Sequence, residues 1–379
     1  MRFYVAGIKI KSTLPLFAVS FRSFDSGKEA DVHITLSSAS CWNLEAEERY
    51  LLTNLAVSSL TVSSLTVSSL KKGGWLFEER GSSFGARILA TNDYADLIIF
   101  EEAPATKESL MRLVCFSLEC RFVHERVLPL HAACVEQGGR AVCFTGDSGV
   151  GKSTRAQAWI KALGAEFISG DRPAVRLEAD GCIACGVPWD GKEQIFRNVE
   201  RPLHAILEVR RAPFTRLRRL SADQAYRVLV RQCFIPMWDS DTAALAMGNI
   251  RRLSCAVPVY RLFCGADPQA ALETHRALFE RPEEILEELP DMKIREGFTL
   301  RKVADEHIVI PTGRNIDKFG GAVVLSEVAA FIFEQLQQPV SREDLLALVL
   351  AEFDVDETAA AADLDELLAQ LRELELLEY

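Results

Sequence analysis

Alternation of apolar and polar side chains dominates the first hundred residues. In residues 3–10 and 30–36 every second side chain is apolar, the period of a half-buried strand. A five-residue pattern, Val-Ser-Ser-Leu-Thr, begins at Val57, recurs at Val62 and returns nearly intact at Val67. A period of five fits neither helix nor strand, so we interpret this segment as an expanded loop or an irregular strand. We expect residues 1–104 to form a β-rich accessory domain.

The middle of the chain alternates between the two periods. Residues 105–125 have helical spacing, and two apolar runs flank the turn signal Gln137-Gly138-Gly139, which predicts an antiparallel hairpin. A helix of residues 153–163 should end at Gly164. The pattern further predicts strands at 205–209 and 259–263, and helices at 222–234, 242–253 and 268–279. Residues 105–280 therefore read as an α/β domain, followed by a charged connector at 281–290.

Residues 291–379 follow a third pattern, a small sheet followed by helices. We expect strands at 298–303, 307–310 and 322–325, then helices at 326–337, 341–353 and 358–374. Ser326 and Ser341 are placed to cap the first two of these helices. This plan is that of a winged-helix-like α+β domain.

Composition indicates folded domains, with 49% hydrophobic and 26% charged residues. No apolar run is long enough to span a bilayer, and lysines interrupt the N-terminus where a signal peptide needs its apolar core, so we expect a cytoplasmic protein with no membrane partner. The ten cysteines form no disulfide framework. Cys182 and Cys185 make the one CxxC, in a segment that reads as a strand, and a lone pair is weak evidence for zinc.

The net charge of −11 is concentrated at one end of the chain. Residues 291–379 hold 8 Lys+Arg against 19 Asp+Glu, which accounts for all of it. A winged-helix-like domain usually binds DNA, but an acidic surface repels phosphates, so we expect no nucleic-acid partner. A peptide laid along the sheet edge is better motivated.

A phosphate-binding motif stands between the hairpin and the helix that follows it. The sequence reads G-x-x-x-x-G-K-S, preceded by an apolar run and followed by a helix, as a nucleotide-binding loop requires. Lys152 is expected to reach the outer phosphates and Ser153 to ligate Mg²⁺. The chain is therefore expected to bind ATP or another nucleoside triphosphate with Mg²⁺. The predicted nucleotide-binding residues are Gly146, Asp147, Ser148, Gly149, Val150, Gly151, Lys152, Ser153 and Thr154.

Three further side chains are candidates for the chemistry. If Gln137-Gly138 centres the hairpin turn, His131 lies opposite Phe144, beside the bound phosphates; otherwise it is a core histidine. Asp171 follows a short apolar run and is a candidate Mg²⁺ ligand or base for an attacking hydroxyl, the alternative being a turn former before Arg172-Pro173. Lys192 either neutralises a transferring phosphate or is a solvated turn lysine.

Two resemblances cover most of the chain. The residues Leu130-His131-Ala-Ala, the loop, and Ile168-Ser-Gly-Asp171 resemble the HPr serine kinase family, which has a phosphoenolpyruvate-carboxykinase-like P-loop core. The resemblance covers about residues 105–280 and implies ATP- and Mg²⁺-dependent phosphorylation of a serine hydroxyl. It makes Asp171 the base and His131 a phosphate-side residue. The family often has two adjacent aspartates where this chain has Gly170-Asp171, so one carboxylate must serve as base or as metal ligand.

The second resemblance lies in residues 292–379. The block that begins at Gly320-Gly-Ala-Val-Val-Leu and the terminal Leu-Arg-Glu-Leu-Glu-Leu-Leu resemble the PqqD-type peptide-recognition element. Such domains bind the leader of a ribosomally made precursor peptide as an added strand, against the third strand and third helix. The groove implied for this chain involves Ala322, Val323, Val324, Leu325, Leu364, Leu367 and Leu371.

The combined interpretation is a serine/threonine kinase that phosphorylates a precursor peptide held by its C-terminal domain. Two alternatives remain. The chain is a kinase of another substrate, such as free serine or a carrier protein, or it is a module that binds nucleotide and peptide and transfers nothing.

Overall fold

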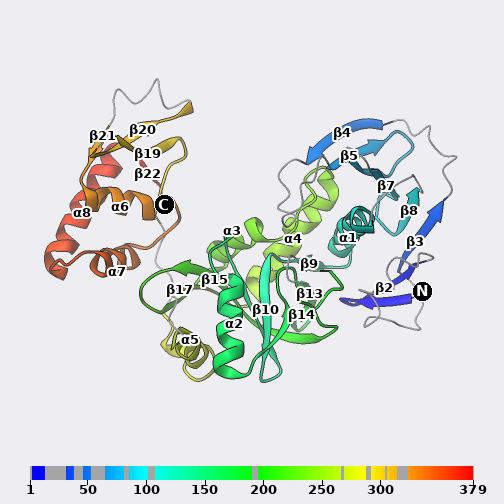
Figure 1. Ribbon diagram of the computed structural model, residues 1–379, viewed down its shortest axis with the longest axis horizontal. Helices are drawn as coiled ribbons and strands as arrows, with labels where there is room; N and C mark the ends of the chain where they lie inside the picture. The colour runs from blue at the N-terminus through cyan, green and yellow to red at the C-terminus, as the bar shows by residue number, and fades with distance from the viewer. Residues whose placement is uncertain are drawn as a thin grey trace. The chain divides into compact units, whose positions relative to one another are not determined.

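The computed structural model divides into two compact units. The N-terminal unit comprises Met1–Arg210, Leu220–Leu262 and Pro268–Glu280, and the C-terminal unit comprises Arg211–Arg219, Phe263–Asp267 and Arg281–Tyr379 (Figure 1). The structure describes residues 2–12, 31–37, 46–52, 65–80, 85–100, 107–189, 195–265, 269–286, 292–303, 305–313 and 323–378.

The N-terminal unit begins with the β-rich region that the alternating pattern predicts. Its strands form one sheet in the order β1-β2-β3-β8-β7-β6-β5-β4. The first copy of the repeated pentapeptide and the start of the second lie outside the described residues. The second copy ends with Leu65 and Thr66 in a regular strand, and the third begins in the same strand at Val67, which pairs with Phe77. The strands are β1 (Arg2–Val5), β2 (Ile8–Ser12), β3 (Val32–Ser37), β4 (Ala46–Leu52), β5 (Leu65–Leu70), β6 (Trp75–Arg80), β7 (Gly85–Ala90) and β8 (Asp96–Phe100).

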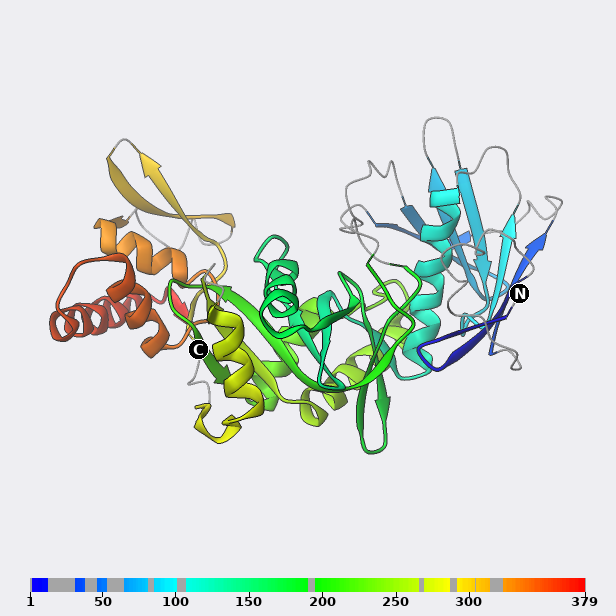
Figure 2. The same cartoon turned by 60° about the horizontal axis from the view of Figure 1, so that its bottom comes forward.

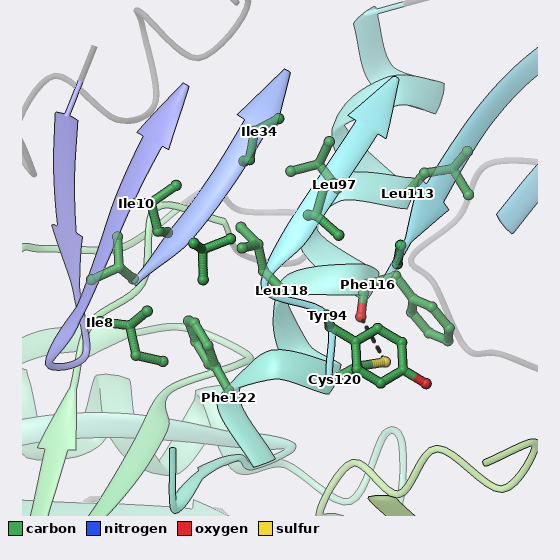
Figure 3. Packing of buried hydrophobic residues seen from close by; sticks show 14 of the residues in the cluster. Ile8, Ile10, Ile34, Tyr94, Leu97, Leu113, Phe116, Leu118, Cys120 and Phe122 are labelled. Carbon is green, nitrogen blue, oxygen red and sulfur yellow. Dashed lines mark hydrogen bonds between the residues drawn. The ribbon is translucent and has the colours of Figure 1, made fainter. Parts of the chain in front are cut away.

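Helix α1 (Lys107–His124) packs against this sheet. Ile8, Ile34 and Leu97 from the strands meet Leu118 and Phe122 of the helix in one buried cluster (Figure 3). The same cluster continues into the second sheet through residues such as Val127, Ala174 and Cys185. The sheet and the α/β region that follows it therefore share a hydrophobic core, with α1 at its centre.

The second sheet runs in the order β12-β10-β11-β15-β14-β13-β9, with β17 also paired to β15. Phe144 of β11 packs on Trp159 of α2 on one face, whereas Cys143 belongs to a cluster with residues of α3 and α4 on the other. Helices therefore cover both faces, as Figure 2 shows. The elements are β9 (Val127–Pro129), β10 (Ala132–Gln137), β11 (Arg140–Thr145), α2 (Lys152–Leu163), β12 (Glu166–Ser169), β13 (Ala174–Glu178), β14 (Gly181–Cys185), β15 (Glu200–Arg211), α3 (Ala222–Gln232), α4 (Ser240–Ala256), β17 (Val259–Cys264) and α5 (Gln269–Phe279).

The C-terminal unit has the predicted three-stranded sheet and three helices, together with short strands that the pattern did not indicate. Ser326 and Ser341 cap α6 and α7, as expected, and accept hydrogen bonds from the amides of Ala329 and Asp344. The two-residue strands β18 and β22 pair with each other. The elements are β16 (Arg216–Arg219), a 3₁₀ turn (Pro282–Glu284), β18 (Lys293–Ile294), β19 (Phe298–Val303), β20 (Glu306–Pro311), β21 (Val323–Leu325), α6 (Glu327–Gln335), α7 (Arg342–Glu352), α8 (Glu357–Glu373) and β22 (Leu377–Glu378).

The segment 211–219 belongs to this C-terminal unit although the sequence places it in the preceding domain. Arg216 of β16 donates to Asp344 of α7 at 2.7 Å, and Arg218 donates to Glu343 at 2.7 Å. Asp344 is fully buried, so its charge requires such a partner. The fold class predicted from the sequence is confirmed: an α/β core with a β-rich N-terminal region and a C-terminal α+β domain.

Candidate active site

The glycine-rich loop joins β11 to α2 and has the backbone that glycine permits. Gly146, Gly149 and Gly151 have φ values of +135°, +80° and +114°, which side chains of L-residues rarely adopt. At Gly146 an added Cβ would also lie 3.2 Å from the carbonyl oxygen of Val209. The two glycines that the motif specifies, Gly146 and Gly151, thus have backbone angles that favour glycine, and so does Gly149 at a variable position of the motif.

Helix α2 starts at Lys152, with Gly151 as its N-cap. Gly151 supplies no side chain to this helix start, so within the described chain no side-chain cap hydrogen bond forms there. N–H groups and the positive end of the helix dipole at such a terminus attract phosphate. Ser153 lies in the first turn and is half-buried, whereas Thr154 is exposed. The helix ends at Gly164 with φ +67°, as its sequence predicts.

The Lys152 ammonium is held inside the loop. Its Nζ donates to the carbonyl oxygens of Gly146 at 3.0 Å and Asp147 at 3.1 Å, and the residue is 8% exposed. Burial lowers the pKa of Lys152, while the carboxylates of Asp171 and Asp147 act in the opposite direction. The ammonium is therefore positioned where the loop backbone turns, with a carboxylate from another segment close enough to affect it.

The hairpin before the loop forms as predicted, but its register is not the predicted one. Ala133 pairs with Phe144, where His131 was expected. The turn is formed by Gly138 and Gly139, whose φ values of +57° and +78° are those of a type I′ turn, the favoured two-residue hairpin connection. Moving the turn by one residue shifts the pairing by two, so His131 lies just beyond the paired strand.

This position still leaves His131 beside the loop. Its backbone N–H donates to the carbonyl of Gln232 at 2.8 Å, and its carbonyl accepts from Thr145 Oγ1 at 2.8 Å. Thr145 immediately precedes Gly146. The strand end that carries His131 is therefore fixed against both α3 and the start of the glycine-rich loop.

Asp171 meets His131 at this strand end. The distance from His131 Nε2 to Asp171 Oδ1 is 3.5 Å, and each side chain is 35% exposed. Burial and the nearby Lys152 ammonium lower the pKa of His131, opposed by the Asp171 carboxylate. The Asp171 carbonyl accepts from the Ala132 amide at 2.9 Å, which fixes the backbone of this turn to β10. His131, Lys152 and Asp171, from three segments, thus lie within electrostatic reach of one another.

Sequence reasoning missed several charged groups around this site. Glu208 of β15 pairs in register with Thr145 and is buried; burial opposes its ionisation, but Arg210 and Arg261 outweigh it and hold the pKa of Glu208 below its ordinary value. Arg261 Nε donates to Glu208 at 2.9 Å. Glu119 of α1 is buried beside Arg172. A charged residue in an apolar strand is the signal that would have singled out Glu208.

The predicted metal ligands fit Mg²⁺ in a complex with nucleotide. Mg²⁺ is commonly held by one or two carboxylates together with substrate phosphates, and Asp171 with the Ser153 hydroxyl offers such a set. Within the described residues no group of three or more His, Cys, Asp or Glu side chains could hold a metal on its own. Cys182 and Cys185 are free buried thiols on strand β14, as the sequence indicates, and burial raises their pKa values to about 11 and about 12. Lys192 lies outside the described residues.

The expected peptide groove is described in part. Strand β21 lies at one end of the β19-β20-β21 sheet, and Val324 at its centre is 58% exposed. Leu364 and Leu371 of α8 are buried in the core of the C-terminal unit, and Leu367 is partly buried against it. These leucines hold the helix in place, so among the described residues of the expected groove the exposed apolar side chain is that of Val324. Val323 and Leu325 are half-buried, and Ala322 lies outside the described residues.

Comparison with known proteins identifies part of this architecture. Residues 306–377 match the family model "Coenzyme PQQ synthesis protein D (PqqD)", so the C-terminal part of the chain is a PqqD-like domain, as predicted. No curated protein matches the chain. No helix in the described part of the chain is long and apolar enough to cross a membrane.

Two solved structures align with parts of the chain. One is "TbiB1 in Complex with the TbiA(beta) Leader Peptide", which is 26% identical, covers 23% of this chain and 94% of that chain, and has a TM-score of 0.20. The other is the Hpr(Ser) kinase/phosphatase from Coxiella burnetii, which is 13% identical, covers 40% of this chain and 98% of that chain, and has a TM-score of 0.23.

Proposed function

We propose that this chain is an ATP- and Mg²⁺-dependent kinase that phosphorylates a serine or threonine hydroxyl of a ribosomally made precursor peptide. The observation that carries the proposal is the meeting of Lys152, His131 and Asp171 beside a glycine-rich loop that opens a helix. The loop supplies a phosphate cradle, and Asp171 supplies a carboxylate beside it.

In the proposed reaction Asp171 takes the proton of the acceptor hydroxyl. The hydroxyl oxygen bonds to the γ-phosphorus, the bond from that phosphorus to the β–γ bridging oxygen breaks, and ADP leaves. Lys152 stabilises the charge on the transferring group, and Lys192 is proposed to assist from another side. In this proposal Asp171 serves as the base, so Ser153 together with the phosphate oxygens would hold Mg²⁺, which supplies charge neutralisation on the phosphates when bound. His131 keeps the Asp171 carboxylate oriented.

The C-terminal unit is proposed to capture the leader of the precursor. Two observations support this: the PqqD match and the sheet-end strand β21 with Val324 exposed. An extended peptide can add to such a strand through backbone hydrogen bonds. Val323, Val324, Leu325 and the partly buried Leu367 are the described residues proposed to contact it. Capture raises the effective concentration of the acceptor hydroxyl.

Intact-mass spectrometry tests the proposal. The purified chain is incubated with ATP, Mg²⁺ and the small peptides encoded beside its gene, and a gain of about 80 Da on one of them marks transfer of a phosphate. Asp171→Asn should abolish the gain, while ATP binding measured by calorimetry stays within about threefold, because the amide keeps the shape but takes no proton. Asp180→Asn, an exposed aspartate in the β13–β14 turn, is the matched control and should leave the gain unchanged.

Other results of this experiment would support one of the two alternative functions. Phosphate on free serine or on a carrier protein, and on none of the peptides, would keep the kinase and reject the peptide substrate. Tight ATP binding with no transfer to any acceptor would leave a nucleotide-dependent binding module. A phosphorylation rate of Asp171→Asn equal to that of the wild type would remove Asp171 from the reaction.

A further inference from the structure

Glu119 of helix α1 is a charged residue buried among apolar side chains. It is 1% exposed and lies between buried apolar neighbours, among them Leu118 and Cys120. A carboxylate in such a position is retained only with strong partners, and apolar replacements at buried ion pairs are often neutral or stabilising. Its contribution to stability therefore does not account for a charge at this place in the core.

Both partners of Glu119 come from the α/β region. Arg172 Nη1 donates to its two carboxylate oxygens at 3.0 and 3.1 Å, and Trp189 Nε1 donates to Oε1 at 3.2 Å. Trp189 also packs on Phe122, one helical turn after Glu119, with ring centroids 5.5 Å apart. With the Glu119 carboxylate beside it, the pKa of the Arg172 guanidinium is raised. One side chain of α1 thus holds two separate segments.

Arg172 is the residue that follows Asp171, so this ion pair bears directly on the site. The Arg172 amide donates to Ser169 Oγ at 3.1 Å, and the Asp171 carbonyl accepts from Ala132 at 2.9 Å. The turn that carries Asp171 is therefore fixed by its backbone to β10 and β12, and by the Arg172 side chain to α1.

We propose that Glu119 is a positioning residue for phosphoryl transfer: through Arg172 it fixes the turn that places the Asp171 carboxylate. The proposal rests on the proposed kinase function. It also assigns a role to the β-rich region, because α1 is seated on that sheet through Leu118 and Phe122 (Figure 3). Packing of α1 on this sheet would fix the helix, and with it the position of the Glu119 carboxylate.

The first test is Glu119→Gln in the full chain. The amide keeps the volume but loses the negative charge and one acceptor for Arg172 and Trp189. We expect kcat for peptide phosphorylation to fall about 10- to 100-fold, as a misplacement of roughly 1 Å does, with the Kd for ATP unchanged within about twofold. A role confined to stability would lower the melting temperature and leave kcat of the folded enzyme intact.

A matched control is a second buried ion pair, whose arginine lies on the same helix. Glu79 of β6 is 2% exposed and pairs with Arg112 of α1, away from Asp171 in sequence and contacts. Glu79→Gln therefore removes a comparable buried ion pair and should lower the melting temperature without changing kcat. Equal losses of kcat in Glu79→Gln and Glu119→Gln would overturn the proposal.

A second variant covers the case in which Glu119→Gln does not fold. Arg172→Lys keeps the charge but loses the guanidinium geometry, so it should lower kcat while leaving ATP affinity unchanged. If both Glu119→Gln and Arg172→Lys have wild-type kcat while Asp171→Asn is inactive, the positioning role is wrong and the kinase stands. If Asp171→Asn is as active as wild type, the proposed function itself fails. When both single variants fold, the Glu119→Gln/Arg172→Lys double variant should lose no more than the stronger single one, because both act on one turn.

Discussion

The charge of the candidate site depends on pH through protonation of His131. Burial and the Lys152 ammonium lower its pKa from the ordinary value of about 6.5, so the imidazole is neutral at pH 7 in the folded protein. Protonating it would add a positive charge beside Lys152 and bind the Asp171 carboxylate that the proposed reaction needs as a base. The enzyme with a protonated His131 should therefore be inactive.

We predict that kcat/KM is constant from pH 8 down to about 6.5 and falls as the pH drops through the lowered pKa of His131. The contribution of His131 to the free energy of unfolding also falls at low pH. Near pH 6.5 the unfolded state takes up a proton on this histidine and the folded state does not. The contribution is therefore complete above that pH and is lost as the pH falls through the folded-state pKa. His131→Gln should lose this part of the pH profile. His33→Gln, at an exposed position on β3, should keep it.

Single residues were predictable where a local pattern determines them. The glycines of the loop have the backbone angles that the motif indicates, and the position of Lys152 inside the loop follows from its place in the motif. Glu119 was not predictable, because its partner Arg172 stands 53 residues away and nothing local distinguishes a buried glutamate from an exposed one on the same helix. Tertiary contacts alone reveal such a pair.

Helix α7 has a cap that links it to another part of its unit. Ser341 is buried; its hydroxyl accepts from the Asp344 amide at 3.1 Å and donates to the Asp344 carboxylate at 2.7 Å. That carboxylate in turn accepts from Arg216 of β16. The cap therefore orients an ion pair as well as closing the helix start.

Ser341→Ala should destabilise α7 by about 1 kcal/mol or more, which increases amide hydrogen exchange in residues 342–352 at least about fivefold. Hydrogen exchange followed by mass spectrometry is the suitable measurement, because none of the tryptophans lies in residues 281–379. Ser326→Ala removes an exposed cap with a single hydrogen bond to the Ala329 amide and should have a smaller effect on α6. Equal effects would show that the Asp344 link adds nothing.

The elements themselves were mostly predictable, because the helices and long strands have clear apolar periods. The hairpin register was not, since Gln137-Gly138-Gly139 allows two turn centres, and only the preference of type I′ turns for two residues with positive φ separates them. The two-residue strands β18 and β22 are too short to show a period. Segment 211–219 was assigned by its neighbours in sequence, whereas its contacts join it to α7.

The full chain should depend on the leader for efficiency rather than for chemistry. Removing the leader from a phosphorylated precursor should lower kcat/KM about 100-fold or more, while the rate at saturating peptide changes little, because tethering acts through effective concentration. Free leader added with the truncated precursor should not restore the rate, and added with the intact precursor it should inhibit competitively. Steady-state assays by mass spectrometry decide this, and equal efficiency without the leader would contradict the capture role.

The C-terminal unit draws on three separate stretches of the chain, and this affects how it can be made. Arg216 and Arg218 leave the ribosome well before the helix that carries their acidic partners Asp344 and Glu343. At roughly 5–20 residues per second, the arginines wait about 6–25 s for that helix. The unit therefore completes only after its last helices and strand β22 have been synthesised. Slowing synthesis between residues 220 and 340 would lengthen the interval in which these early segments are exposed to misassembly.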